Sequence, residues 1–173
     1  WPRDPKNGYA VDVAASKDML AKEKPKLVVL GKSLIMLPEP TKEIAAVCKE
    51  LGIICVFDGA HVLGLIAGGQ FQDPLPEGCD ILLGSTHKTF FGPQRGVVLS
   101  NLDEDKWKRI DKKAFPGSLS NHHLFTLPPL LVAAYEMEAF GAAYAKQVCS
   151  NAQAFAKALA GHGFDVQLAE FGY

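Results

Sequence analysis

The chain has 173 residues, nearly half of them hydrophobic, and its 18 basic and 19 acidic side chains give a formal net charge of −1. This composition can form a sizeable core and excludes an intrinsically disordered chain. Because the sequence has no basic run, no acidic tail and no apolar stretch long enough to span a bilayer, neither nucleic acid nor a membrane is expected as the main partner.

Strand and helix patterns alternate along the first part of the chain. In chain order, we expect a helix over 11–23, a strand over 26–31, a helix over 41–51, a strand over 53–57 and a short helix over 61–67. Thr41 is the expected N-cap residue of the second helix. The strand over 53–57 is apolar throughout rather than alternating, which is typical of a sheet covered on both faces.

The pattern continues in the second part of the chain. We expect strands over 80–84 and 96–100, a helix over 103–113, a long Ala-rich helix over about 129–160 and the start of a strand over 164–169. Strands that alternate with helices predict an α/β fold with helices on both faces of the sheet. We assign residues 1–160 to this domain and 161–173 to the start of a second one. The irregular beginning and the stop just inside a predicted strand indicate a piece of a longer enzyme.

The cysteines and histidines show no metal-binding spacing. None of the four cysteines belongs to a CxxC pair; they are Cys48, Cys55, Cys79 and Cys149. We therefore expect reduced, mostly buried thiols, as in a cytoplasmic protein. The adjacent His122 and His123 have no third ligand at metal spacing, so no zinc site is expected. Elsewhere, Gly92 and Gly96 with Arg95 form a candidate anion-binding loop.

Polar residues follow three of the predicted strands, at 31–33, 58–61 and 85–88. In open α/β sheets, ligands bind at the strand ends, where the loops converge. Taken singly, Asp58 is equally well interpreted as a helix N-cap, and Lys88 is better interpreted as a surface lysine whose stem covers apolar neighbours. The two residues therefore have to be considered together.

Asp58 and Lys88, at the ends of neighbouring strands, are the acid and the amine that a pyridoxal phosphate site requires. The lysine amine forms a Schiff base with the aldehyde of the cofactor, and the carboxylate keeps the pyridine nitrogen protonated so that the ring accepts electrons. His61 lies shortly after Asp58, and His87 directly precedes Lys88. These positions favour a role of both histidines in the site over a structural one.

Two segments of the sequence, FDGAHVLGLIAGGQF at 57–71 and GSTHKTFFGPQRGVVLS at 84–100, resemble the serine hydroxymethyltransferase family. The pattern is an Asp-x-Ala-His turn, a Thr-His-Lys-Thr segment and then a Gly-Pro turn. The resemblance extends over essentially the whole chain, including the strand end at 31–33 and the FPG stretch at 115–117. It implies the large domain of a fold-type I, aspartate aminotransferase-like enzyme: a three-layer α/β/α sandwich around a mostly parallel sheet.

The resemblance also implies a role for each site residue. Lys88 is expected to form the internal aldimine and Asp58 to be the partner of the pyridine nitrogen, and with His61 they make up the expected catalytic set. Ala60 is expected to lie against one face of the ring, while His61 and Ser33 approach the phenolic oxygen and the substrate side. The remaining expected contacts line the aldimine and phosphate region; they are Ser85, Thr86 and His87.

The implied reaction moves the hydroxymethyl carbon of serine to a tetrahydropterin acceptor of the tetrahydrofolate type and leaves glycine, with pyridoxal 5'-phosphate as cofactor. The family builds its cofactor site from two subunits, so a homodimer is expected. The chain departs from the common bacterial form in two places. It has SLSNHH at 118–123 instead of a glycine-rich segment that reaches the phosphate of the neighbouring subunit, and GPQRG at 92–96 instead of Gly-Pro-Arg-Gly-Gly. Both departures indicate a divergent, archaeal-like branch.

Two alternatives stay open at this point. Another fold-type I enzyme that acts on amino acids, such as a threonine aldolase, would share the aspartate and the lysine, although the motif around Lys88 favours the first interpretation. A non-catalytic binding or assembly fragment would keep the fold without turnover. The 173 residues alone are expected to be inactive, because the family's ring-stacking residue and its carboxylate-binding arginine fall outside them.

Overall fold

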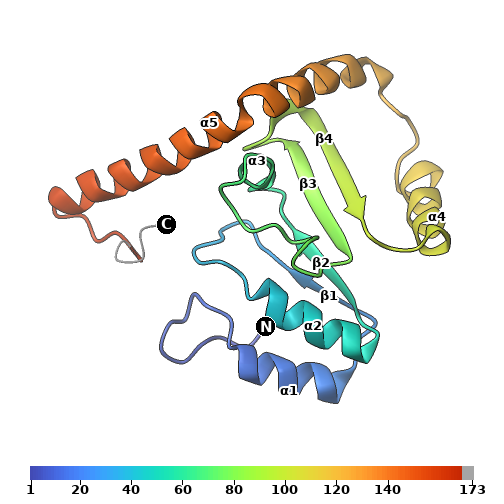
Figure 1. Ribbon diagram of the computed structural model, residues 1–173, viewed down its shortest axis with the longest axis horizontal. Helices are drawn as coiled ribbons and strands as arrows, with labels where there is room; N and C mark the ends of the chain where they lie inside the picture. The colour runs from blue at the N-terminus through green and yellow to red at the C-terminus, as the bar shows by residue number, and fades with distance from the viewer. Residues whose placement is uncertain (169–173) are drawn as a thin grey trace.

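The computed structural model describes residues 1–168, with a mixed four-stranded sheet at its centre (Figure 1). The strands follow one another in the order β1-β2-β3-β4. They are β1 (Leu27–Leu30), β2 (Ile54–Asp58), β3 (Ile81–His87) and β4 (Phe91–Ser100). The first three strands are parallel to one another, and β4 returns antiparallel to β3.

Helices cover the sheet from two sides. Figure 1 shows α1 and α2 together on one side of the sheet, while α5 runs along the opposite side, past α3. The helices are α1 (Val13–Glu23), α2 (Thr41–Leu51), α3 (Leu63–Ala67), α4 (Glu104–Lys112) and α5 (Leu127–Gly161), with short η1 (Lys113–Ser118) and η2 (Leu124–Thr126) turns between the last two. This arrangement confirms the predicted α/β sandwich with a mostly parallel sheet.

The core lies between α2 and the sheet. Ile44 and Cys48, one helical turn apart on α2, are both buried, and they belong to one cluster with Leu30 of β1 and Phe57 of β2. Phe57 and Leu30 are 0% exposed, and burial of side chains of this size stabilises the fold by about 1.5–3 kcal/mol each. Gly52 ends α2 in a left-handed conformation with φ of 68°, as its place after the last apolar residue predicts. The strands are thereby fixed as a rigid support for the loops at their ends.

Three local predictions were wrong. Thr41 does not cap α2: Pro40 precedes the helix, and the Thr41 hydroxyl donates a hydrogen bond to the Glu39 carbonyl oxygen at 3.3 Å. The segment 92–96 is neither a Gly-Pro turn nor an anion-binding loop, because it lies inside β4. Residues 164–168 do not form a strand, and residue 169 lies outside the described residues. Pairing of β4 with β3 is what takes residues 92–96 out of a turn.

The long helix and the thiols agree with expectation. The predicted helix over 129–160 is α5, whose end at Gly161 coincides with the proposed domain boundary; the division into domains itself stays a prediction. Cys48, Cys55 and Cys79 are buried, and Cys149 is partly exposed. Within residues 1–168, no helix is both long and apolar enough to cross a membrane.

Candidate active site

The ends of the parallel strands bring two of the predicted segments together. Asp58 is the last residue of β2, and it pairs with Leu83 of the adjacent strand β3. Gly31 follows β1 and lies directly against Asp58: a Cβ atom on Gly31 would stand 2.2 Å from the Asp58 carbonyl oxygen. Gly31 also has a φ of 87°, so both space and conformation require glycine here. The segment that carries Ser33 therefore leaves the sheet beside Asp58.

Asp58 is oriented by its own turn. Its Oδ1 accepts a hydrogen bond from the Ala60 N–H at 3.0 Å, and the Gly59 N–H continues the ladder to the Leu83 carbonyl oxygen at 2.9 Å. The helix N-cap interpretation is wrong, since α3 begins at Leu63 with no side-chain cap. In the described part of the chain, Asp58 Oδ2 has no hydrogen bond or ion pair, so this oxygen keeps its full capacity to accept a hydrogen bond from a ligand.

Lys88 lies in the turn between β3 and β4, and this turn is fastened to the segment that follows Asp58. The Thr89 hydroxyl donates to the His61 carbonyl oxygen at 2.6 Å and accepts from the Gly64 N–H at 3.1 Å. A Cβ atom on Gly64 would stand 2.1 Å from the Thr89 carbonyl oxygen, so only glycine permits this approach. The turn is thereby held beside His61, and the exposed Lys88 amine has no ion pair to residues 1–168.

The three polar residues at the end of β3 have different environments. Thr86 is 3% exposed, and its hydroxyl faces two carbonyl oxygens of β4, those of Pro93 at 2.6 Å and Arg95 at 3.1 Å. A hydroxyl has a single proton, so that proton is used inside the hairpin. Ser85 is half-buried and His87 is exposed, which leaves both side chains available at the strand end.

The loop that carries Ser33 is held by Glu39 and Gln72, which the sequence did not single out. Lys32 Nζ forms an ion pair with Glu39 Oε1 at 2.7 Å, and the Glu39 side chain is only 3% exposed. The Gln72 side chain binds the backbone of Glu39 twice. Its Oε1 accepts a hydrogen bond from the Glu39 N–H at 2.8 Å, and its Nε2 donates one to the Glu39 carbonyl oxygen at 2.6 Å. The signal in the sequence was slight: a single acid between two prolines after an apolar run.

Arg95 has a structural role in place of the predicted anion-binding one. Its guanidinium donates hydrogen bonds to the carbonyl oxygens of His122 and His123 and to the Thr126 hydroxyl. These contacts tie the loop before α5 to β4, and the rings of Phe115 and His122 pack at 3.8 Å between centroids. In the described part of the chain, no group of three His, Cys, Asp or Glu side chains is placed to hold a metal ion.

Two cavities lie at opposite ends of the strands, and neither has Asp58 or Lys88 in its wall. One of about 620 Å³ lies beside the candidate site, with Gly31, Lys32 and Glu39 in its wall. The other, of about 780 Å³, lies at the opposite edge of the sheet, where β1, β2 and β3 begin. We assign the candidate site to the first edge, because ligands of α/β sheets bind at the carboxyl ends of the strands.

A family model and two similar proteins carry the same description. A family model for serine hydroxymethyltransferase matches residues 4–169. The serine hydroxymethyltransferase of Korarchaeum cryptofilum is 52% identical over 163 residues, which are 94% of this chain and 37% of that protein. That of Pyrococcus abyssi is 49% identical over 175 residues, 100% of this chain and 41% of that protein. The chain thus spans about two-fifths of the length of these relatives.

A solved structure is similar over nearly the same extent. The L-threonine transaldolase of Pseudomonas fluorescens, in its internal aldimine state, matches with a TM-score of 0.91 and 36% identity. The match covers 99% of this chain and 39% of that one. The arrangement of strands and helices described above is therefore that of an established fold.

Proposed function

The chain belongs to the serine hydroxymethyltransferase family, and on this premise we propose that the whole protein interconverts serine and glycine. It transfers the one-carbon unit to a tetrahydropterin acceptor and uses pyridoxal phosphate as cofactor. The observation that carries the proposal is the fastening of the Lys88 turn to the segment after Asp58 through the Thr89 hydroxyl. This contact holds the amine and the carboxylate at adjacent strand ends.

The described residues fit this cofactor. Asp58 presents one carboxylate oxygen that is held by the Ala60 N–H and another that is open. Lys88 presents an exposed primary amine on the adjoining turn. A carboxylate for the ring nitrogen and an amine for the aldehyde are the two groups that pyridoxal phosphate requires from its protein.

Each predicted site residue has a part in this proposal. Lys88 would hold the cofactor through Nζ, and Asp58 would keep a proton on the ring nitrogen. When bound, the cofactor supplies a conjugated ring that spreads negative charge from the α-carbon of the amino acid. Ala60 would lie against the ring, and Ser33 and His61 would face the substrate side. Ser85 and His87 would supply the remaining contacts, while Thr86, whose hydroxyl proton is used within the hairpin, would support the end of β3 behind them.

The similarity to a threonine transaldolase supports a second candidate, an aldol-type reaction on threonine. That neighbour is 36% identical to the chain, whereas the serine hydroxymethyltransferases above are 49–52% identical. The more similar relatives favour serine as substrate. Both candidates need the same aspartate and lysine, so substrate preference separates them.

A homodimer in the cytoplasm completes the proposal. The apolar face of α5 supports the dimer, since Leu131, Val132 and Tyr135 are each more than half exposed. Large exposed apolar patches on proteins mark interaction sites. The buried free thiols of Cys48, Cys55 and Cys79 are in keeping with a reducing compartment.

The test uses the full-length protein loaded with pyridoxal phosphate. Conversion of serine to glycine with a tetrahydropterin such as tetrahydrofolate supports the proposal, and faster cleavage of threonine than of serine would favour the aldolase. Borohydride reduction followed by peptide mapping should label Lys88. A label on another lysine would show that the site is assigned to the wrong residue, and Lys88→Ala should remove the label without unfolding the protein.

A further inference from the structure

We propose that Glu39 is a positioning residue, which holds the loop of Ser33 in place through its ion pair with Lys32. The inference rests on the proposed function, because that function gives Ser33 its role beside the cofactor. Nothing in the family resemblance or in the motifs around Asp58 and Lys88 pointed to Glu39. It follows from the contacts of residues 31–40.

Ser33 is not fixed by contacts of its own. Residues 31–40 contain no helix or strand, Ser33 is exposed, and it makes no hydrogen bond within residues 1–168. The loop starts at Gly31, which is fixed against the Asp58 backbone. A second fixed point is therefore needed to define where Ser33 lies, because a loop held at one end samples many conformations.

Glu39 supplies this second point. The Gln72 side chain binds both its N–H, at 2.8 Å, and its carbonyl oxygen, at 2.6 Å, so the backbone that carries the carboxylate is anchored. The carboxylate then reaches Lys32 Nζ at 2.7 Å. Since Lys32 is the residue before Ser33, this contact closes the loop on both sides of Ser33.

Burial of Glu39 argues for position rather than stability. Its side chain is 3% exposed, and Oε1 accepts no hydrogen bond in the described part of the chain, so its charge is met by Lys32. A buried carboxylate is costly, and an apolar pair of similar volume in its place is often as stable or more stable. Unlike an apolar pair, the ion pair holds two loop residues, Lys32 and Glu39, in a defined orientation.

The experiment is a double-mutant cycle in the full-length enzyme. Lys32→Met should lower kcat/KM for serine about 10- to 100-fold, the range expected for a misplaced site residue. In a Ser33→Ala background, the same change should cause little further loss, because both changes act through one residue. Lys42→Met, at an exposed residue of α2, is the matched control and should have no effect. Losses from Lys32→Met and Ser33→Ala that simply multiply would overturn the inference.

A second variant separates positioning from stability. Lys32→Met leaves the Glu39 carboxylate buried and unpaired, so it should also lower the melting temperature. Lys32→Met/Glu39→Gln removes that charge and should restore the melting temperature while kcat/KM stays low. Recovery of kcat/KM together with the melting temperature would show that the ion pair is only structural.

A readout independent of turnover keeps the two proposals distinguishable. Amide hydrogen exchange of Glu39 and Thr41, whose N–H groups are hydrogen-bonded to the Gln72 side chain and to the Glu39 carbonyl oxygen, should be at least about 10-fold faster in Lys32→Met than in the wild type and in Lys42→Met. If the wild-type enzyme did not convert serine, the proposed function would fail, and exchange alone would decide whether the ion pair holds the loop. Unchanged exchange in an active enzyme would refute the inference and leave the function standing.

Discussion

At the scale of single residues, the site depends on side chains whose orientation is set by nearby backbone. Asp58 Oδ1 is held by the Ala60 N–H, while Oδ2 has no hydrogen-bond partner within residues 1–168. Thr86 is equally polar, yet its hydroxyl proton is used by the carbonyl oxygens of β4. Residue type alone therefore does not decide which polar groups remain available to a ligand.

The charge of Asp58 should matter more than its shape. Asp58→Asn keeps the size of the side chain, but in the proposed site it would no longer hold the ring nitrogen protonated. We expect turnover of serine by the full-length enzyme to fall at least about 100-fold, as for the loss of a central electrostatic contact. Steady-state kinetics measures this, with the exposed Asp73→Asn as a control that keeps normal turnover. Near-normal turnover of Asp58→Asn would refute the assignment.

The buried thiols should be unreactive in the native protein. Hydrogen bonding to the Cys55 thiol, together with burial, raises the pKa of Cys48 well above its ordinary value. For Cys55, the hydrogen bond with Cys48 lowers the pKa, but the hydrogen bond with Cys79 and burial outweigh it and raise the pKa to about 12. Because the thiolate is the reactive form, iodoacetamide at pH 8 should alkylate the partly exposed Cys149 first. Mass spectrometry checks this, and equal rates at Cys55 and Cys149 would contradict it.

The same pKa shift has a consequence for alkaline stability. The unfolded Cys55 thiol ionises near its ordinary value of 9.0, while the folded thiol stays protonated up to about 12. Because the pKa of Cys55 is higher in the folded than in the unfolded protein, the protonated thiol contributes to stability below pH 9.0. This contribution is lost as the pH rises toward 12. The fall in unfolding free energy across this range should accordingly be smaller in Cys55→Ala than in the wild type.

At the scale of elements, the decisive feature is the contact of the β3–β4 turn with the segment 61–64, which leads into α3. Thr89 makes a hydrogen bond to each side of that segment, and Gly64 leaves room for the turn to approach. The loops of two elements thus become one unit, which carries both Lys88 and His61.

Loss of the Thr89 hydroxyl should loosen this unit. Thr89→Val keeps the shape but leaves the His61 carbonyl oxygen and the Gly64 N–H without this partner. We expect the free energy of unfolding to fall by about 1–3 kcal/mol, the cost of unsatisfied buried groups. Denaturant unfolding of the full-length protein measures it. Thr89→Ser keeps a hydroxyl and should be close to the wild type, so equal stability of Val and Ser variants would refute the role of these hydrogen bonds.

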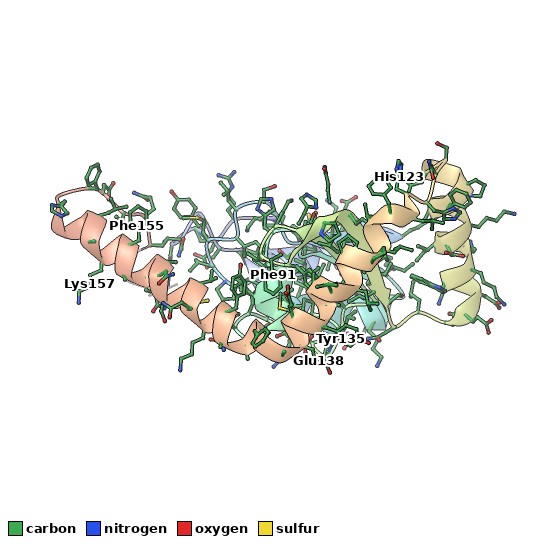
Figure 2. All side chains as sticks on the ribbon, turned by 90° about the horizontal axis from the view of Figure 1, so that it is seen from above. Phe91, His123, Tyr135, Glu138, Phe155 and Lys157 are labelled. Carbon is green, nitrogen blue, oxygen red and sulfur yellow. The ribbon has the colours of Figure 1, made fainter. Side chains whose placement is uncertain are left out.

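At the scale of the whole molecule, α5 is much longer than the surface that it covers. Its buried residues form one stripe, Ala133, Met137, Gly141 and Ala145, which faces α3 and β4. The far end of the helix, with Phe155 and Lys157, extends beyond the sheet, as Figures 1 and 2 show. Residues 1–168 leave large side chains on its other faces uncovered, among them Tyr135, which is 64% exposed.

A charge within this uncovered face should weaken the proposed dimer. Burial of a large apolar side chain contributes about 1.5–3 kcal/mol, so Tyr135→Glu should raise the dissociation constant of the full-length dimer at least about 10-fold. Analytical ultracentrifugation over a concentration series measures this constant. Lys157→Glu, also on α5 but already charged, serves as the control. An unchanged constant for Tyr135→Glu would place the interface elsewhere.

The sequence by itself determined the elements and the segments of the site. Continuous apolar runs predict β1 and β2, and apolar residues at helical spacing predict α2. Asp58 and Lys88 became candidates for the site because polar segments that follow buried strands contain them. These signals are local: a strand or helix is encoded by residues that adjoin one another, and so is the strand end where a ligand binds.

Only the tertiary structure decided how these segments are held. Lys32 and Glu39 are close in the sequence, but Gln72, which anchors Glu39, is 33 residues away. Arg95, predicted to bind an anion, instead donates a hydrogen bond to the carbonyl oxygen of His122, which is 27 residues away. The length of β3 and β4 likewise depends on their antiparallel pairing. A hydrogen bond or ion pair has a definite partner only when the folded chain brings two distant residues within about 3 Å, and no local pattern encodes that distance.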